Sequence, residues 1–476
     1  MPRQPRYFIP RIPQKVIDRG VDRQAVFFNR FDPYWPLGKG PGLCEKGLVV
    51  IGGTERVHHM LTFLKKWQQA VSCVLVLLAA DVVPAAEQSL LYVARAPRDR
   101  TGFRTLAPSI EVFDIDNGHA LVKVIPLDVP DGTTPVANVR GITASAATQT
   151  LFISHYGSYK DLRPGRELSG HVLALDIETD RVLWNRAYES SVDRGAVTPD
   201  GSTLFMPSGE LATTPFFYII DAATGAEQPE QRITVARYTH NTVVTLDGSR
   251  VFMSAFGGWG NTNFEPYIHI ADTSTGEVVQ KVGPFSAHVR PITINGAATL
   301  VFANVNNLIG FQVGDVVSGK VLYTARAPVE KSERSGPGQF VSHGISLTAD
   351  ETEVWVVDQI NSGVHVFDVR GLPDSAPVYK QYIDTHDGSE QDAQGNYLYG
   401  ETGVVNQPGW LMSSIDGKTL YPESGEIIDV AAKQVIGNLI GANGAYVHSR
   451  FALEVEVRDG TVVRVGDQQG VGRIVP

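Results

Sequence analysis

Tyr238-Thr-His-Asn-Thr-Val-Val-Thr-Leu-Asp-Gly-Ser-Arg-Val-Phe-Met-Ser254 joins two short apolar runs across an Asp-Gly dipeptide. This pattern is typical of a β-hairpin with a tight turn. Related segments begin at Arg194, His288 and His343, a spacing of about 50 residues that indicates an internal repeat. The first run of each segment opens on a polar residue, and three consecutive units open on histidine.

A second signature follows each hairpin, an apolar run closed by aspartate and a turn, as in Phe217-Tyr-Ile-Ile-Asp-Ala-Ala-Thr-Gly225. Seven such runs end at Asp114, Asp176, Asp221, Asp272, Asp315, Asp368 and Asp429. Short strands at even spacing are the mark of a β-propeller. The sequence therefore predicts an all-β fold, a seven-bladed β-propeller.

The two ends of the repeat region predict how the ring closes. Ser89 to Ala94 reads as the second strand of a blade with no first strand before it, and Tyr446 to Val455 is a strand without partners. We expect the C-terminal strand to complete the first blade, which hides sheet edges that would otherwise pair with other chains.

The hairpin Thr198-Pro-Asp-Gly-Ser-Thr-Leu-Phe205, followed by the turn Ile220-Asp-Ala-Ala-Thr-Gly225, resembles the exported YVTN/YncE-like seven-bladed propellers. The resemblance covers roughly residues 88–476. It implies an exported propeller and leaves the activity open, because that superfamily includes scaffolds, binders and enzymes.

The N-terminal region predicts export. Residues 60–86 combine Lys65 and Lys66, an apolar run from Ala70 to Ala80 and small residues for cleavage, which is the pattern of a secretory signal peptide. We interpret residues 1–59 as a mis-annotated extension, the alternative being a disordered segment ahead of an uncleaved anchor. The mature domain is then 87–476, periplasmic or secreted, monomeric and without a membrane span.

Composition and missing motifs exclude several functions. A net charge of −10 argues against nucleic acid as a partner. No phosphate-binding loop, dinucleotide fingerprint or Cys-x-x-Cys-His motif is present, so we expect no nucleotide and no c-type haem.

Residues that open the innermost strands of a propeller face one mouth of its axis. Here they are Arg140, Arg194, His240, His288, His343, the Asn406-Gln407 pair and His448. Four imidazoles predict a divalent transition metal, Fe, Cu, Zn or Mn, bound by His240, His288, His343 and His448. The arrangement is similar to that of carotenoid oxygenases and oligogalacturonate lyases, but no motif of either family is present. The alternative is that these polar residues bond neighbouring backbone.

Other residues at the same mouth are candidates for binding or catalysis. Arg140 and Arg194 offer bidentate forks to an anionic ligand, or else pair with an acid such as Asp193. His155 is a candidate general base, with Tyr156 beside it; the alternative is a packed rim. Long loops carrying Trp259 and Gln407 are candidates for recognition.

Two functions from different classes remain. The first is a propeller that binds a small anionic ligand at the axial mouth, beside a histidine-bound metal that could serve a lyase or oxidoreductase reaction. The second is a non-catalytic scaffold for a protein, peptide or glycan.

Overall fold

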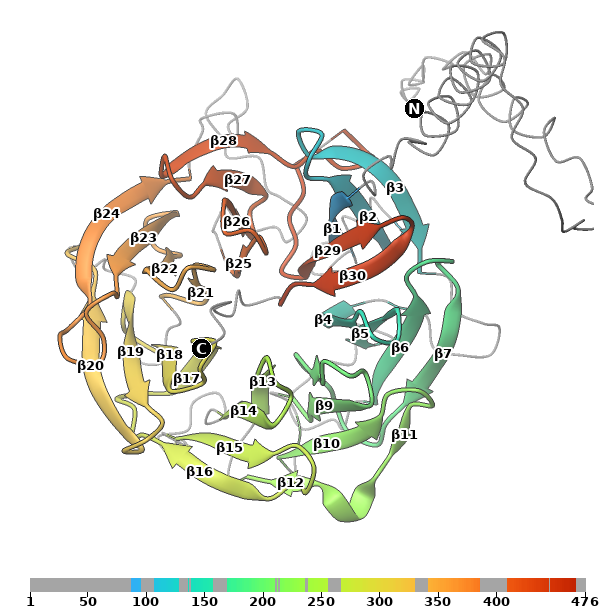
Figure 1. The fold of residues 1–476 in the computed structure, drawn as a ribbon, viewed down its shortest axis with the longest axis horizontal. Coiled ribbons are helices and arrows are strands. Elements are labelled where there is room, and N and C mark those ends of the chain that lie inside the picture. Colours follow the sequence, from blue (N-terminus) through green and yellow to red (C-terminus); the bar gives the residue numbers. More distant parts are fainter. Residues whose placement is uncertain are drawn as a thin grey trace, which may run out of the picture. The chain divides into compact units, whose positions relative to one another are not determined.

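The computed structural model describes residues 87–95, 107–127, 136, 138–156, 169–209, 212, 215–235, 239–255, 267–329, 341–385, 409–444 and 446–467. All lie in one compact unit, Val82–Pro476. Seven antiparallel sheets surround a central axis, as Figure 1 shows. The predicted seven-bladed β-propeller is confirmed. The segments 1–59 and 60–86, with both cysteines, lie outside the described residues, and no helix within the described ranges is long and apolar enough to cross a membrane.

Five blades are ordinary four-stranded sheets, whose strands follow one another from the axis outward. In blade 2 they are β4 (Asn138–Ser145), β5 (Thr150–Tyr156), β6 (Gly170–Asp176) and β7 (Val182–Ala187). In blade 4 they are β13 (Thr239–Val244), β14 (Arg250–Ala255), β15 (Ile268–Asp272) and β16 (Val278–Val282). In blade 5 they are β17 (Val289–Ile294), β18 (Leu300–Val305), β19 (Gly310–Asp315) and β20 (Lys320–Arg326). In blade 6 they are β21 (Ile345–Leu347), β22 (Glu353–Asp358), β23 (Gly363–Asp368) and β24 (Val378–Asp384). In blade 7 they are β25 (Leu411–Ser413), β26 (Thr419–Pro422), β27 (Glu426–Asp429) and β28 (Gln434–Asn438).

Blade 3 has a divided outer strand. Its inner strands are β8 (Ala196–Val197), β9 (Thr203–Pro207) and β10 (Phe216–Asp221), and β10 pairs with two short strands, β11 (Ala226–Glu227) and β12 (Ile233–Thr234). The 3₁₀ helix η2 (Pro229–Gln231) separates them. Pro229 has no N–H to donate to the ladder, which explains the interruption at this edge.

Blade 1 is built from both ends of the propeller chain. Its strands are β1 (Glu87–Arg95), β2 (Ser109–Asp114), β3 (Ala120–Pro126), β29 (Ala452–Arg458) and β30 (Thr461–Val465), in the order β3-β2-β1-β29-β30. The C-terminal strand β29 pairs with β1 over seven residues, from Glu87 opposite Arg458 to Val93 opposite Ala452. The predicted closure of the ring is therefore confirmed.

The fifth strand of this sheet, β30, was not predicted. It lies on the axis side of β29 (Figure 1). The Gln149 amide covers its free edge: Gln149 Nε2 donates to the Val462 carbonyl at 2.8 Å, and the Val462 N–H donates to Gln149 Oε1 at 2.9 Å. A neighbouring blade thus satisfies backbone groups that an open edge would leave unpaired.

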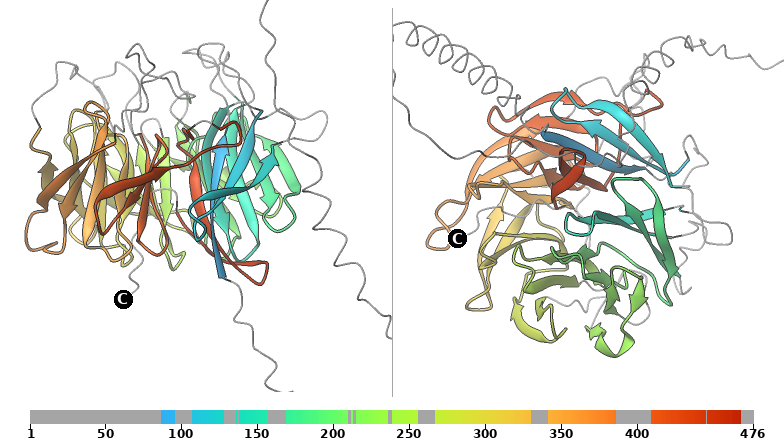
Figure 2. Two further views of the ribbon diagram at one scale, coloured as in Figure 1. Left: turned by 90° about the horizontal axis from the view of Figure 1, so that it is seen from above. Right: turned by 45° about the vertical axis from the view of Figure 1, so that its right-hand side comes forward.

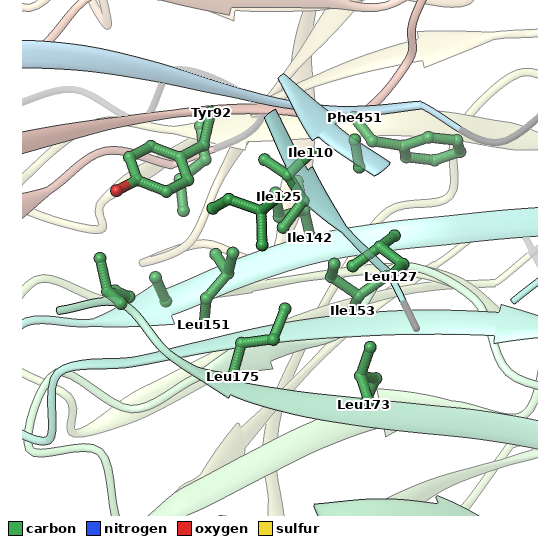
Figure 3. Packing of buried hydrophobic residues seen from close by; sticks show 14 of the residues in the cluster. Tyr92, Ile110, Ile125, Leu127, Ile142, Leu151, Ile153, Leu173, Leu175 and Phe451 are labelled. Carbon is green, nitrogen blue, oxygen red and sulfur yellow. The ribbon is translucent and has the colours of Figure 1, made fainter. Parts of the chain in front are cut away.

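Apolar residues on both faces of the inner strands make the core. Figure 3 shows this packing between blades 1 and 2, where Ile110 and Ile125 from one blade approach Ile142 and Ile153 from the other. Burial of each such side chain contributes about 1.5–3 kcal/mol. Seen from the side in Figure 2, the sheets stand face to face around the axis. Outer strands alternate between exposed and covered residues, as expected for strands with one solvated face.

The recurring aspartates close turns. Asp221 Oδ1 accepts from the Thr224 N–H at 2.9 Å and from the Thr224 hydroxyl at 2.7 Å. Gly225 follows with a φ of 71°, a conformation that glycine adopts without strain. This local chemistry explains why the Asp-x-x-Thr-Gly signature repeats along the chain.

Candidate functional site

The start of three inner strands carries a β-bulge. The register of each inner pair shifts by one residue, between Val139 and Gly141, between Thr239 and Thr242, and between Val289 and Ile292. Arg140, His240 and Arg290 lie within these bulges. Because a bulge redirects the side chain of the extra residue, these strands have a local reason to turn a polar side chain out of the blade.

The hairpin turns give the register of the whole ring. In five blades the residue that begins the turn donates its N–H to the carbonyl five residues further on; these residues are Thr198, Thr245, Asn295, Thr348 and Ser414. The residue five positions before each of these turn residues occupies the same place in its blade, at the start of the innermost strand. In blades 1 and 2 the equivalent residue is found from the pairing of β29 with β1 and of β4 with β5. In blade order these positions are Arg450, Arg140, Asp193, His240, Arg290, His343 and Gly409.

Three of the predicted ring residues, Arg140, His240 and His343, occupy these equivalent positions. His288 and His448 each lie two residues earlier, because the structure places Arg290 and Arg450 in register. His288 contacts Asn306, with Nδ1 3.4 Å from the Asn306 amide nitrogen. Gln407, like Trp259, lies outside the described residues.

Arg194 follows the ring position of blade 3 and has a specific place at the axis. Its backbone pairs with Asn241 of blade 4, so the inner strands of two blades are in direct contact. Its guanidinium carbon lies 3.0 Å from the centroid of the Trp410 ring and 4.8 Å from that of Phe451. The residue is 2% exposed. This arrangement is a buried cation–π contact between blades 3 and 7.

Two imidazoles lie against the same tryptophan. The His240 ring is stacked on Trp410 with centroids 5.7 Å apart, and the His343 ring meets it edge-on at 5.2 Å. The centroids of His240 and His343 are 5.4 Å apart. We call Arg194, His240, His343 and Trp410, with the charged residues described next, the axial cluster.

The charged members of the axial cluster are four arginines and two acids. Arg140 Nη2 lies 3.0 Å from Asp193 Oδ2, and Arg450 Nε lies 2.6 Å from Glu423 Oε1. The fourth arginine, Arg290, donates through Nε to the neutral amide oxygen of Asn306 at 2.6 Å. The Arg140 and Arg450 side chains keep 19% and 29% of their surface exposed, whereas Arg290 is buried. The cluster therefore extends from solvent into the interior.

Burial and neighbouring positive charges lower the pKa values of two residues in this cluster, Arg194 and His343. Burial holds the pKa of Arg194 well below its usual range, and Arg450 and Arg140 add to that effect, while Asp193 and Glu423 oppose it. Burial also lowers the pKa of His343 well below its usual range, reinforced by His240, Arg290, Arg450 and Arg194. His343 is consequently a neutral imidazole at pH 7.

The Arg194 guanidinium carries a buried donor without an acceptor among the described residues. Nη1 of Arg194 makes no hydrogen bond within the described part of the chain. A buried donor of a charged group without an acceptor costs stability. The Arg194 fork is thus suited to an acceptor from outside the described chain.

Glycine is required where the inner strands of blades 6 and 7 meet. A Cβ on Gly409 would lie 1.5 Å from Glu423 Oε2, and one on Gly344 would lie 2.0 Å from the Gly409 carbonyl oxygen. Any side chain at Gly409 would therefore move the Glu423 carboxylate, and with it the Arg450 ion pair.

His155 lies inside blade 2. It is fully buried, its ring stacks on His171 with centroids 5.2 Å apart, and Nε2 is 3.3 Å from Asn185 Oδ1. Burial, with a smaller effect of His171, lowers its pKa to about 4. The neighbouring Tyr156 donates its hydroxyl to the Val192 carbonyl at 2.8 Å, and the Arg140 guanidinium lies 5.6 Å from its ring centroid. These contacts are those of packed residues, and Tyr156 lies against Arg140 of the axial cluster.

The predicted metal ligands are only partly brought together. Among the described residues, no group of three or more His, Cys, Asp or Glu side chains is arranged to hold a metal ion. His240 and His343 are neighbours, whereas His288 and His448 lie outside the ring register. The histidine-bound metal stays a prediction.

Four residues of the axial cluster were missed from the sequence: Arg290, Arg450, Trp410 and Glu423. Arg290 could have been found from turn chemistry. Blade 5 places Ala298, with a φ of 52°, where blade 4 has Gly248, with a φ of 73°. In the sequence, Gly296 aligns with Gly248, because both follow an Asn or Asp in the turn. That alignment shifts blade 5 by two residues and places His288, in place of Arg290, at the ring position.

Comparisons with known proteins add little beyond the fold. No protein family model matches the chain, and no curated protein matches it. Among solved structures, the chain is similar to the hydrazine synthase of Kuenenia stuttgartiensis, with 18% identity, a TM-score of 0.45, and 64% of this chain and 80% of that one covered. It is also similar to the Cps50 (Swd1) β-propeller domain of Myceliophteria thermophila, with 10% identity, a TM-score of 0.47, and 71% and 90% covered. A chain of the mitotic checkpoint complex matches with 13% identity, a TM-score of 0.45, and 66% and 78% covered.

Proposed function

We propose that this propeller binds a small anionic ligand at the axial cluster. The supporting observation is a gathering of arginines at the axis, where the described residues place the guanidinium groups of Arg140, Arg194, Arg290 and Arg450 in one cluster. Arginine presents its donors in a planar fork that matches the oxygens of carboxylate, phosphate or sulfate. Arg140 and Arg450 keep part of their surface exposed, so they present the edge of the cluster to an anion in solvent.

The chain's overall charge gives this gathering its significance. The protein is acidic, with a net charge of −10, so four arginines gathered in one cluster depart from the average of the chain. Positive charges gathered in a confined, partly buried place attract an anion more strongly than the same charges in bulk solvent.

The experiment is a calorimetric titration with sulfate, phosphate and succinate at low ionic strength. Arg194→Gln and Arg290→Gln should each weaken binding at least tenfold. Arg326→Gln is the matched control, because Arg326 is exposed on the outer strand β20. Absence of binding by all three anions, or equal weakening in the control, overturns the proposal.

The proposal extends to export and to a metal. The signal-peptide pattern of residues 60–86 supports a periplasmic or secreted protein. The His240–His343 pair supports a divalent metal beside the anion, and such a centre would make a lyase or oxidoreductase reaction accessible.

A non-catalytic scaffold for a protein, peptide or glycan is the second candidate function. The generic blade signatures favour it, and absence of anion binding in the same titrations would support it.

A further inference from the structure

The segment 191–194 carries two members of the axial cluster from blade 2 to blade 3. It lies between β7 and β8, and all four of its residues are buried. Its last two residues are Asp193, which pairs with Arg140, and Arg194, which lies on the Trp410 ring. The position of this backbone therefore sets where both side chains lie.

Two hydroxyl groups at the end of β5 hold this segment by its carbonyl oxygens. Ser154 Oγ donates to the Asp193 carbonyl at 2.7 Å, and the Tyr156 hydroxyl donates to the Val192 carbonyl at 2.8 Å. All four residues are buried, so water competes little for these carbonyls. Blade 2 thus fixes two consecutive peptide groups of the segment.

Gly141 makes room for the Ser154 bond. It lies opposite Ser154 on β4, and a Cβ there would be 2.9 Å from Ser154 Oγ and 2.9 Å from the Arg194 Cα. Blade 4 has Asn241 at the equivalent place, one residue after the ring position, and there Ser254 donates to Asn241 Oδ1 at 2.6 Å within its own blade. The glycine of blade 2 therefore lets the serine hydroxyl reach the next blade.

We propose that Ser154 and Tyr156 are positioning residues of the axial cluster: their hydroxyl groups hold the 191–194 backbone, and with it the Arg194 guanidinium, in place for the anion. This inference rests on the proposed anion binding and adds residues behind the site. Each hydroxyl hydrogen is engaged by a carbonyl of the segment, so neither group is assigned a bond to the ligand. Donors that are already held in the bound geometry bind more tightly than donors that must first be ordered.

The experiment compares two buried tyrosines whose hydroxyl groups make the same kind of bond. The Tyr188 hydroxyl donates to the Gly225 carbonyl at 2.9 Å, in the outer turn between β10 and β11 of blade 3. In calorimetric titrations with sulfate at low ionic strength, Tyr156→Phe and Ser154→Ala should each weaken binding about fivefold, the effect of one hydrogen bond. Tyr188→Phe should leave the affinity unchanged.

Circular dichroism melts separate positioning from stability. A structural role alone predicts lower melting temperatures without weaker sulfate binding. Equal weakening in Tyr156→Phe and Tyr188→Phe, or no weakening in either Tyr156→Phe or Ser154→Ala, overturns the positioning role.

Hydrogen exchange separates this inference from the proposed function. The N–H groups of Asp193 and Arg194 donate to carbonyls of blades 3 and 4. Both amides should exchange faster in Ser154→Ala and Tyr156→Phe than in Tyr188→Phe, measured by mass spectrometry on peptides that cover the segment. If the unchanged protein binds no anion, the proposed function fails, and the exchange rates alone decide whether the two hydroxyl groups hold the segment. Equal rates in all three variants overturn the inference.

Discussion

The Arg194 guanidinium carbon lies 3.0 Å from the centroid of the Trp410 ring, although the two residues belong to blades 3 and 7 of a seven-bladed ring. Such a contact crosses the axis and joins blades that are not neighbours. Propeller blades otherwise pack mainly on their neighbours, so a cross-axis contact ties the two halves of the ring together.

Replacement of Trp410 should therefore affect both stability and binding. Trp410→Ala removes the ring face under Arg194 and the stacking partner of His240, and we expect a loss of about 3–5 kcal/mol in the free energy of unfolding. Trp410→Phe keeps an aromatic face and should lose less. Urea unfolding followed by circular dichroism measures both values, and an unchanged midpoint for the alanine variant contradicts the cross-axis role.

The buried Arg95–Glu111 pair is a second fixed point, at the seam where the ring closes. The two groups are 2.6 Å apart and each is 1% exposed, and the Ala442 N–H donates to Glu111 Oε1 at 3.0 Å. Glu111→Gln breaks this buried ion pair and should cost about 3–5 kcal/mol in the free energy of unfolding. The double replacement Arg95→Met with Glu111→Leu should cost less than Glu111→Gln alone.

The exposed Lys418–Asp416 pair provides the control for this experiment. Lys418 keeps 82% of its side chain exposed, so Lys418→Ala should leave the unfolding midpoint unchanged. A Glu111→Gln protein as stable as the Lys418→Ala protein would show that the seam does not depend on the buried pair.

Acid should destabilise the propeller through its buried histidines. The pKa of His155 falls from 6.5 to about 4, mainly by burial, and burial likewise lowers that of His269 to about 4. The unfolded chain then binds more protons than the folded chain between pH 6.5 and pH 4, so stability is full above pH 6.5 and is lost as the pH falls. Each pH unit changes the free energy by about 1.4 kcal/mol per group, or about 3 kcal/mol for each histidine over this window.

His155→Gln should flatten this dependence. Urea unfolding at pH 7, 6, 5 and 4 should give a shallower loss of stability for the variant than for the unchanged protein. Identical slopes in the two proteins would mean that His155 titrates normally when folded.

Truncation tests the closure of the ring. Deletion of 446–476 removes β29, leaves the inner edge of β1 unpaired and should abolish cooperative unfolding. A shorter deletion that ends the chain at Asp459 removes β30, its ladder with β29, the buried Val462 side chain and the Gln149 bridge but keeps the ring closed, so we expect unfolding that stays cooperative with a lowered midpoint. Equal melting curves for the full-length chain and the longer deletion would refute the closure.

The sequence predicted the fold well because each blade repeats local turn chemistry. The Asp221 turn and the Gly248 turn are readable from adjacent residues, and their spacing indicates strands on either side. β30 was not readable, because its residues carry no blade signature and its edge depends on Gln149, more than three hundred residues away in the chain.

The axial cluster was predicted only in part, for a different reason. Its inner residues depend on the register of a bulged strand, and a two-residue error selects His288 in place of Arg290. Trp410 and Glu423 carry no signal in sequence, since their role depends on contact with Arg194 of blade 3 and Arg450 of blade 1. Local sequence patterns predict the blades, whereas the contacts at the axis form between residues of several blades and are not visible in any one repeat.

The predicted histidine–metal centre can be tested because its four histidines occupy two kinds of position. His240 and His343 have neighbouring rings at the axis, whereas His288 and His448 lie two residues out of the ring register. Protein purified from the exporting compartment should carry transition metal by elemental analysis, and His240→Ala or His343→Ala should lower the content more than His288→Ala or His448→Ala. His119→Ala is the control, because His119 lies in the turn between β2 and β3. Acidification to about pH 6 should release the metal, since protonated imidazole cannot coordinate it. Protein that is metal-free and cannot be loaded would refute the metal centre and leave the proposed anion site to be tested by itself.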